Sequence, residues 1–396
     1  MTAIAEETTN TEPSNTEPRA TAAAISGIVD LGDGRGFLRM TGYRRSAGDI
    51  PVSTAQVRQY GLRTGDHIEG TMASHQAKTR QAETRQANAQ QGKTQQDKAR
   101  QDKTLLTVES VNGLPVAEAR HRRYFDDLTP IYPNQRFRLE DGDPSRTARI
   151  IDLVSPIGKG QRGLIVAPPK AGKTTVLKTI AHAIATAYPA VHLMLVLVGE
   201  RPEEVTDLRR TVRGEVVAST FDQSPSDHIK AAELGQDVVV MLDSLTRLGR
   251  AYNLGAPANG RTLTGGVAVS ALQPPRQFLG AARCLEEGGS LTILSTVLID
   301  TGSALDSVLF EEFKGTGNME LRLRRDLAEK RLFPAIDTAP SGTRREDLLM
   351  SPAEHAAVVS LRRALAVLDS QHALELLLEK TAVPNEQFLR QVSAAK

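Results

Sequence analysis

The sequence contains no tryptophan, a single cysteine and few aromatic residues of any kind. Phe and Tyr together make up 4% of the chain, so a dense aromatic platform on which nucleic-acid bases stack is not expected. The lone cysteine, Cys284, excludes an internal disulfide and is typical of a protein in a reducing cytoplasm. We interpret it as a packed small residue rather than a reactive thiol. The longest apolar run, 191–198, is too short to span a bilayer and fits a buried strand better.

The N-terminus also lacks the apolar core of a secretion signal. Residues 1–20 are rich in Thr, Glu, Asn and Pro, which predicts a disordered tail. The hydrophobic fraction of 40% and the charged fraction of 24% are ordinary for a globular protein, and a net charge of +2 excludes no partner. A chain of 396 residues has room for two or more domains. Composition therefore predicts a soluble, cytoplasmic, multidomain protein that does not use a membrane.

Residues 21–111 have the pattern of a small β-barrel. Short β-prone runs alternate with turn signals from Ile25 to Thr71, and the strand signal resumes at Leu105. Between these parts, 73–104 is an insertion built largely of imperfect five-residue polar repeats such as QAKTR and QAETR. Its repeats cannot bury an apolar face. Two interpretations stay open, a basic tether with weak, salt-sensitive affinity for RNA and an inert disordered insert.

Residues 112–150 are predicted to be a connector, and from 151 to 396 the pattern becomes that of an α/β domain. Apolar strands are expected near 164–167, 191–198, 215–220, 237–242 and 291–299. Helices are expected between them, near 173–187, 203–213, 227–234, 244–252 and 265–282. Such alternation predicts a parallel sheet covered by helices on both faces. After Ser351 the pattern is helical, with apolar spacing in 353–368 and 371–380.

The strongest local motif is APPKAGKTT, residues 167–175. An apolar strand leads into it and a helix-forming run follows, which is the setting that a phosphate-binding loop requires. Backbone N–H groups at the helix start would cradle the phosphates of ATP. Lys173 would reach the β- and γ-phosphates, and the Thr174 hydroxyl would bind Mg²⁺. The other expected nucleotide contacts are Pro169, Lys170, Ala171, Gly172 and Thr175.

Two carboxylates are candidates for the chemistry. The run VVVMLD ends at Asp243, and a carboxylate at the end of a parallel strand faces the crevice where such sheets bind ligands. Asp243 would therefore hold the metal ion through water. The strand 191–198 is expected to neighbour the loop strand, which makes Glu200 a candidate for polarising the attacking water. The pattern leaves open that Glu200 is an ordinary carboxylate at a helix start.

Longer strings carry a more specific resemblance. They include SPIGKGQRGLIVAPPKAGKTT (155–175), GERPEEVTDL (199–208), DSLTRLGRAYN (243–253), AEKRLFPAID (328–337) and SGTRRED (341–347). With these strings the sequence resembles the Rho-type transcription termination factors, a family of ring-forming RecA-type RNA helicases, over roughly 25–72 and 105–395. The resemblance implies an oligonucleotide-binding (OB) barrel followed by a RecA-like P-loop ATPase domain with a helical C-terminal part. It also implies a homohexameric ring around RNA.

The resemblance assigns further roles in the ATPase site by matching position. It makes Glu200 the catalytic carboxylate, places Arg201 among the nucleotide contacts and stacks Phe333 on adenine. Arg344 matches the family's arginine finger, which completes the site of a neighbouring subunit. Arg331 and Arg247 match arginines that link the nucleotide and RNA sites.

Two loops are implied to line the central pore of the ring, RTLTGGV (261–267) and IDTGS (299–303). Glycines and hydroxyls in these loops allow close approach to phosphates and 2′-hydroxyls. The implied RNA contacts are Arg261, Thr264, Gly265, Gly266, Thr301, Gly302 and Ser303. Ala304 stands where the family typically has a lysine, which reduces the charge of the pore.

The barrel departs further from the family pattern. Only Phe37 remains of two expected aromatics, with Arg35 at the other position, and Pro51 stands where a stacking tyrosine is expected. Because bases also stack on guanidinium planes, Arg35, Phe37 and Arg39 are expected to form an altered RNA site.

The function predicted from these residues is an RNA-stimulated ATPase that uses ATP and Mg²⁺. It would bind the nascent single-stranded transcript, translocate 5′ to 3′ and release the transcript from RNA polymerase, with elongation factors as further partners. A rotary ATP-synthase-like subunit is one alternative, which the pore loops and LRTGD (62–66) oppose. A non-catalytic RNA-binding scaffold is the other, which the complete catalytic set opposes.

Overall fold

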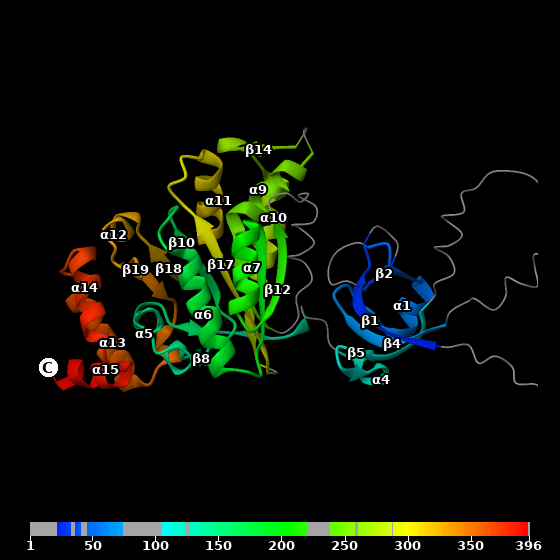
Figure 1. Ribbon diagram of the computed structural model, residues 1–396, viewed down its shortest axis with the longest axis horizontal. Coiled ribbons are helices and arrows are strands. Elements are labelled where there is room, and N and C mark those ends of the chain that lie inside the picture. Colours follow the sequence, from blue (N-terminus) through cyan, green and yellow to red (C-terminus); the bar gives the residue numbers. More distant parts are fainter. Residues whose placement is uncertain are drawn as a thin grey trace, which may run out of the picture. The chain divides into compact units, whose positions relative to one another are not determined.

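The computed structural model describes residues 22–32, 36–40, 46–73, 105–122, 127–220, 238–257, 260–286 and 288–394 (Figure 1). The predicted tail, most of the predicted insertion, Arg35 and the helix expected near 227–234 lie outside these ranges. The chain divides into two compact units, one within 1–122 and the other within 123–396. The predicted connector therefore divides between them, with its first eleven positions, 112–122, in the first unit.

The first unit is a curved antiparallel sheet with two short helices. Its strands follow the order β3-β2-β1-β4-β5-β6, and β3 also lies against β5. The elements are β1 (Ala22–Asp30), β2 (Gly36–Arg39), β3 (Ile50–Val52), α1 (Thr54–Tyr60), β4 (His67–Ala73), β5 (Leu105–Val111), β6 (Leu114–Pro115) and α4 (Val116–Ala119).

Alternation along the strands builds the core of this barrel. In β1 the side chains of Ile25 and Val29 point inward and pack against Leu38 and Ile68, while those of Ser26 and Ile28 lie on the opposite, more exposed face. Strand β4 bends where it meets β5, and a Cβ on Gly70 would stand 2.1 Å from the carbonyl oxygen of Thr107. Only glycine permits so close an approach of the two backbones.

The second unit is built on a mostly parallel sheet in the order β12-β11-β13-β17-β10-β18-β19, in which only β19 runs antiparallel to its neighbour. The strands are β10 (Arg162–Ala167), β11 (His192–Glu200), β12 (Glu215–Thr220), β13 (Val238–Asp243), β17 (Ser290–Leu298), β18 (Met319–Leu323) and β19 (Ile336–Thr343). Shorter strands extend or flank it, namely β7 (Pro130–Ile131), β8 (Arg136–Phe137), β9 (Ile157–Gly158), β14 (Thr262–Leu263), β15 (Val267–Ala268) and β16 (Arg283–Leu285).

Helices cover both faces of this sheet (Figure 1). Leu193, Leu195 and Leu197 of β11 pack on one face with α6 and α7, while the alternate side chains of β11 are buried on the opposite face. The α-helices are α5 (Arg146–Val154), α6 (Lys173–Ala187), α7 (Pro202–Thr211), α9 (Leu245–Gly255), α10 (Val269–Gly280), α11 (Ala304–Lys314), α12 (Arg325–Glu329), α13 (Pro352–Leu365), α14 (Ser370–Lys380) and α15 (Asn385–Ala394). Three 3₁₀ turns complete the described elements, η2 (Leu139–Asp141), η3 (Thr264–Gly266) and η4 (Glu346–Leu349).

The predicted fold class is confirmed, but one expectation about strand order is wrong. Strand β11 does not neighbour the loop strand β10, because β13 and β17 lie between them. Strands close in sequence are usually close in the sheet, and here two strands from later in the chain are inserted between β10 and β11. The C-terminal helices α13 to α15 gather at the β19 side of the sheet (Figure 1).

Candidate nucleotide site and RNA-facing loops

The loop between β10 and α6 has the backbone shape of an anion-binding turn. Strand β10 ends at the buried Ala167, and α6 begins at Lys173. Lys170 and Gly172 have left-handed backbones, with φ of 68° and 89°, and Gly172 is the N-cap of α6. A helix start leaves several backbone N–H groups without partners in the helix, and these groups bind phosphates. Pro169 and Lys170 are exposed at this turn.

An aromatic ring flanks the same loop. A Cβ on Gly172 would stand 3.6 Å from Cε1 of Phe333, so the ring lies beside the start of α6. Phe333 is 48% exposed, which is unusual for so large an apolar side chain. Its open face is available to a flat ligand.

Lys173 bridges two carboxylates from neighbouring strands. Its Nζ lies 2.5 Å from Oδ1 of Asp243, at the end of β13, and 3.1 Å from Oε1 of Glu200, at the end of β11. Both carboxylates are almost fully buried. Three sequence-predicted residues are thus brought together, because β11 and β13 pair in parallel and end at the same edge of the sheet.

Oxygen donors suited to Mg²⁺ converge beside the lysine. Oδ1 of Asp243 accepts a hydrogen bond from Thr296 at 2.7 Å, while its Oδ2 is buried without a hydrogen-bond partner among the described residues. The Thr174 hydroxyl donates to Glu204 at 3.2 Å. Mg²⁺ prefers hard oxygen ligands of this kind, and the unpartnered Oδ2 of Asp243 fits such an ion. Neither Thr296 nor Glu204 was among the predicted site residues.

Glu200 has the environment of a general base. Burial, and next the negative charge of Asp243, raise the pKa of Glu200 above its usual value despite the cations of Lys173 and Arg247. Arg247 Nη1 lies 2.9 Å from Oε1 of Glu200 and also donates to the carbonyl of Gly199. A carboxylate with a raised pKa accepts a proton more readily than an ordinary glutamate.

The remaining predicted arginines lie at different parts of the second unit. Arg201 is exposed at the start of α7, next to Glu200. Arg331 is exposed with a φ of 61°, two residues before Phe333. Arg344 follows β19 at the opposite end of the sheet, since Thr343 pairs with Met319 and Met319 pairs with Gly163 near the start of β10.

The two predicted pore loops lie side by side. A Cβ on Gly265 would stand 3.0 Å from the carbonyl carbon of Ala304, so the η3 turn touches the start of α11. Arg261, Thr264, Gly265, Gly266 and Gly302 are exposed here. Thr301 and Ser303 are half-buried. The Thr301 hydroxyl donates to Asp306 at 2.6 Å, and Ser303 caps α11.

Helix α9 supports both loops, through residues that the sequence analysis did not single out. Asn253 bridges the first loop by donating to Gly266 O at 3.1 Å and accepting from Ala268 N at 2.7 Å. Arg250 pairs with Asp306, with 2.7 Å between Nε and Oδ1. Because α9 begins directly after the Asp243 strand, the loops and the nucleotide edge share one helix.

The role of Arg39 in the barrel differs from the predicted RNA contact. Its side chain is 4% exposed and forms ion pairs with Asp30 and Asp49. It therefore stabilises the barrel instead of presenting a free guanidinium face to a base, which corrects the prediction for this residue. Phe37 is half-buried and pairs across the sheet with Pro51. Arg35 lies outside the described residues.

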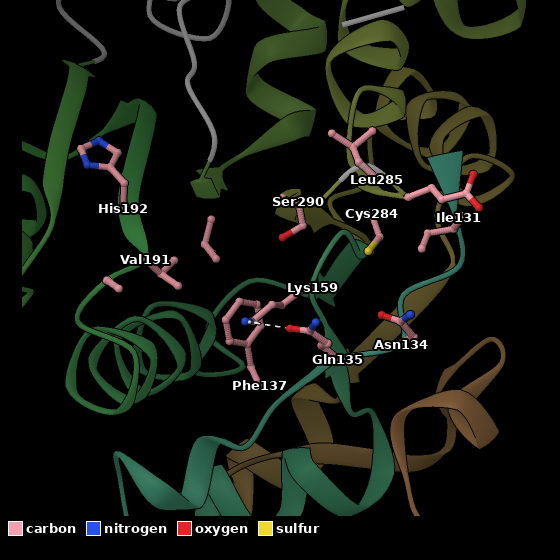
Figure 2. Close-up of a pocket in the computed structure, with 15 residues that line it drawn as sticks. Ile131, Asn134, Gln135, Phe137, Lys159, Val191, His192, Cys284, Leu285 and Ser290 are labelled. Carbon is pink, nitrogen blue, oxygen red and sulfur yellow. Dashed lines mark hydrogen bonds between the residues drawn. The ribbon is translucent and has the colours of Figure 1, made fainter. Parts of the chain in front are cut away.

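A separate cavity of about 390 Å³ lies at the starting edge of the parallel strands and contains no predicted site residue (Figure 2). Its lining includes Cys284, Lys159 and Gln135, and Lys159 Nζ donates to the Gln135 side chain at 3.1 Å. Burial raises the pKa of the Cys284 thiol, which disfavours the reactive thiolate. This fits the interpretation of Cys284 as a packed residue.

Comparison with known families resolves the identity of the two units. The model of the Rho termination factor RNA-binding domain matches residues 25–117. The model of the ATP synthase alpha/beta family nucleotide-binding domain matches residues 147–343. A protein of Streptosporangium roseum called transcription termination factor Rho is 51% identical, over 96% of this chain and 95% of its own length. The chain belongs to the Rho family. The resemblance predicted from the sequence strings is thereby confirmed.

Other Rho proteins are longer than this chain. Those of Micrococcus luteus and Mycobacterium tuberculosis are each 52% identical over 93% of the chain, which spans 54% and 61% of their respective lengths. Among solved structures, an ATPase of a type III secretion system shares the fold, with a TM-score of 0.56 and 23% identity over 68% of this chain and 87% of its own. The likeness covers the fold alone. Among the described helices, none has the length and apolar character to cross a membrane.

Proposed function

We propose that this Rho-family chain is an RNA-stimulated ATPase that moves 5′ to 3′ along a nascent transcript and releases it from RNA polymerase. The observation that carries the proposal is the bridge from Lys173 to Glu200 and Asp243 at the end of a phosphate-binding turn. A lysine, a metal-binding carboxylate and a buried base at one strand edge are the parts that ATP hydrolysis needs.

ATP binding follows from the turn and its neighbours. The N–H groups at the start of α6 and the ammonium of Lys173 hold the phosphates, while Phe333 stacks on the base. When ATP is bound, the Lys173 ammonium contacts the phosphates and no longer pairs with Glu200 and Asp243. Asp243 and Thr174 would hold Mg²⁺, which neutralises charge on the phosphates.

Glu200 orients the attacking water and accepts its proton. Its buried position keeps the carboxylate away from bulk solvent, and Arg247 fixes its orientation through the 2.9 Å contact. The raised pKa suits a group that takes up a proton during the reaction.

The arginine finger has to act on another copy of the chain. Thr343, just before Arg344, is level with Gly163 of β10, since both pair with Met319. From Gly163 to Ala167 is four residues, or about 13 Å along a strand. Strand β18 also separates the turn from β10. Arg344 therefore does not reach the phosphate loop of its own subunit, and it would stabilise transition-state charge in a neighbour. This geometry supports an assembly of several copies, and the family resemblance makes that assembly a homohexameric ring.

RNA would contact the paired loops around Gly265 and Gly302. Their glycines leave backbone groups accessible, and Arg261 adds a cation. The link through α9 gives a physical route by which closure at the nucleotide site moves the loops. Phe37 would take part in loading RNA onto the barrel, and elongation factors would act as further partners.

The first test is Lys173→Ala, with Lys178→Ala as the matched control. Lys178 lies on the same helix and, within the part of the chain that the structure describes, pairs only with Asp207 at the surface. We expect Lys173→Ala to lose RNA-stimulated ATP hydrolysis and transcript release, because the phosphates lose their cation. Lys178→Ala should retain both activities. ATP hydrolysis and termination in vitro measure the two outcomes, and normal termination by Lys173→Ala would contradict the proposal.

A further inference from the structure

The turn that carries Arg344 is held firmly at its backbone. Oγ1 of Thr343 donates to the carbonyl oxygen of Pro156 at 2.6 Å, and the backbone N–H of Arg344 donates to the carbonyl oxygen of Asn318 at 2.9 Å. Asn318 is in turn fixed to the start of β10, because its Oδ1 accepts hydrogen bonds from Gln161 and from the Arg162 backbone at 2.5 and 2.8 Å. The turn is therefore anchored to the central sheet.

The next residue, Arg345, is held by its side chain. Its Nε and Nη2 donate to Asp347 at 3.0 and 2.9 Å, and its guanidinium lies 5.5 Å from the centre of the Tyr132 ring. Arg345 has a left-handed backbone, with a φ of 56°. A residue other than glycine adopts that conformation only where its surroundings hold it there. Tyr132 and Asp347 supply contacts that do so.

The two adjacent arginines thus differ in what their side chains do. Arg345 is engaged on both sides, whereas the exposed Arg344 guanidinium has no hydrogen bond or ion pair with the described residues. Burial, and next the charges of Arg283 and Arg344, lower the pKa of Arg162, so three cations lie near one another at this edge. Like charges repel, so neither Arg162 nor Arg283 offers the exposed Arg344 guanidinium a partner in its own subunit.

We propose that Tyr132, Arg345 and Asp347 form a presenting frame that aims Arg344 at the nucleotide site of a second copy of this chain. The proposal rests on the proposed function, since it requires Arg344 to act in a neighbour. The three frame residues are positioning residues, because they act through Arg344 and contact no substrate themselves. The frame predicts an effect on turnover rather than on ATP binding.

The variants Tyr132→Ala and Arg345→Gly remove the frame in two ways. Tyr132→Ala removes the ring on which Arg345 stacks, while Tyr132→Phe keeps that ring and serves as the matched control. Arg345→Gly removes the stacking and ion-pairing side chain but tolerates the left-handed backbone without strain. A misplacement of about 1 Å in a catalytic group costs on the order of a hundredfold in rate. We therefore expect kcat for RNA-stimulated ATP hydrolysis to fall about tenfold to a hundredfold in both variants, with KM for ATP unchanged and Tyr132→Phe at the parental rate.

Mixed rings show whether the defect acts between subunits. A Lys173→Ala chain cannot hydrolyse ATP but still presents an intact Arg344 to its neighbour. Mixing it with Tyr132→Ala or Arg345→Gly chains should raise activity above that of either chain alone, as it should for Arg344→Ala chains. Unchanged kcat in both frame variants, a change confined to KM, or no rescue in mixed rings would overturn the frame. Full activity of Arg344→Ala rings would instead contradict the proposed function, so the two failures are distinguishable.

Discussion

Replacing Arg39 by alanine tests whether this residue stabilises the barrel or contacts RNA. The guanidinium is 4% exposed and ion-pairs with Asp30 on β1 and with Asp49, which precedes β3. Its removal leaves two carboxylates facing each other without a cation, with Asp49 only 5% exposed. The barrel is expected to lose stability, and Phe37 loses the contact of its ring with the Arg39 guanidinium, which lies 5.3 Å from the ring centre.

The size of the loss follows from the burial of the pair. Removing one partner of a buried ion pair costs about 3–5 kcal/mol. Because Asp30 is 18% exposed and keeps some hydration, the lower end, about 3 kcal/mol, applies. Since about 1.4 kcal/mol is a factor of ten, hydrogen exchange that requires the barrel to open should speed up about a hundredfold.

Hydrogen exchange of the full-length chain measures this unit by unit. Amides of β1, β2 and β4 should lose protection in Arg39→Ala, while those of β10 and β11 should not change. Arg58→Ala, which removes an exposed arginine from α1, is the matched control and should alter stability by no more than about 0.5 kcal/mol. Phe37→Ala should show the converse effect, with RNA affinity weakened by about 1–3 kcal/mol and protection retained.

A specific outcome would refute this reasoning. If Arg39→Ala retained the parental exchange rates but bound RNA more than tenfold more weakly, then Arg39 would serve RNA binding, directly or through the Phe37 ring beside it, and would not stabilise the barrel. The ion pairs with Asp30 and Asp49 would then contribute nothing measurable. RNA affinity has to be measured below the temperature at which the variant barrel opens.

Two further predictions concern the pore and the base. Ala304→Lys places a cation at the loop pair around Gly265, so RNA affinity should rise and the slope of log affinity against log salt should steepen by about 1. An unchanged slope would place Ala304 away from the RNA. Because the pKa of Glu200 is raised, kcat/KM for ATP should begin to fall, on acidification, at a pH above that of an ordinary glutamate. A profile that falls only near the ordinary glutamate value would contradict this direction.

The candidate nucleotide site could be predicted because local sequence patterns identify its residues. An apolar strand, a glycine-containing turn and a helix follow one another at 164–187, so Lys173 was placed from neighbouring residues alone. Glu200 and Asp243 were found because each ends an apolar strand. That both carboxylates lie beside Lys173 does not depend on the expected order of strands. Parallel strands end at a common edge, so Glu200 contacts Lys173 although β13 and β17 separate their strands.

Partners far apart in sequence could not be predicted in the same way. Arginine is a residue type that often contacts RNA, so the sequence favoured that role for Arg39. Only the fold shows that Asp49 lies close enough to form an ion pair with Arg39. The anchor of Arg344 joins Gln161 and Asn318, which are 157 residues apart. Strands β18 and β19 were not predicted either, because neither has the continuous apolar run of the predicted strands: charged residues interrupt β18, while Asp337, Pro340 and Gly342 interrupt β19. Residue type thus indicates what a side chain can do, while burial decides whether it is available.

Under the proposed function, strand β10 connects parts of two different nucleotide sites, one in its own subunit and one in a neighbour. The end of β10 leads into the phosphate-binding turn at Lys173. At its start, the backbone N–H of Arg162 donates to the Asn318 side chain, and the carbonyl oxygen of Asn318 accepts a hydrogen bond from the backbone N–H of Arg344. A subunit with an acceptor site at one edge of the sheet and a donor at the other is suited to head-to-tail contact. Such contacts leave one unpaired donor and one unpaired acceptor at the ends of any open assembly, and only closure into a ring pairs them all. The placement of Arg344 and Lys173 at opposite ends of the sheet therefore favours the closed ring of the proposed function.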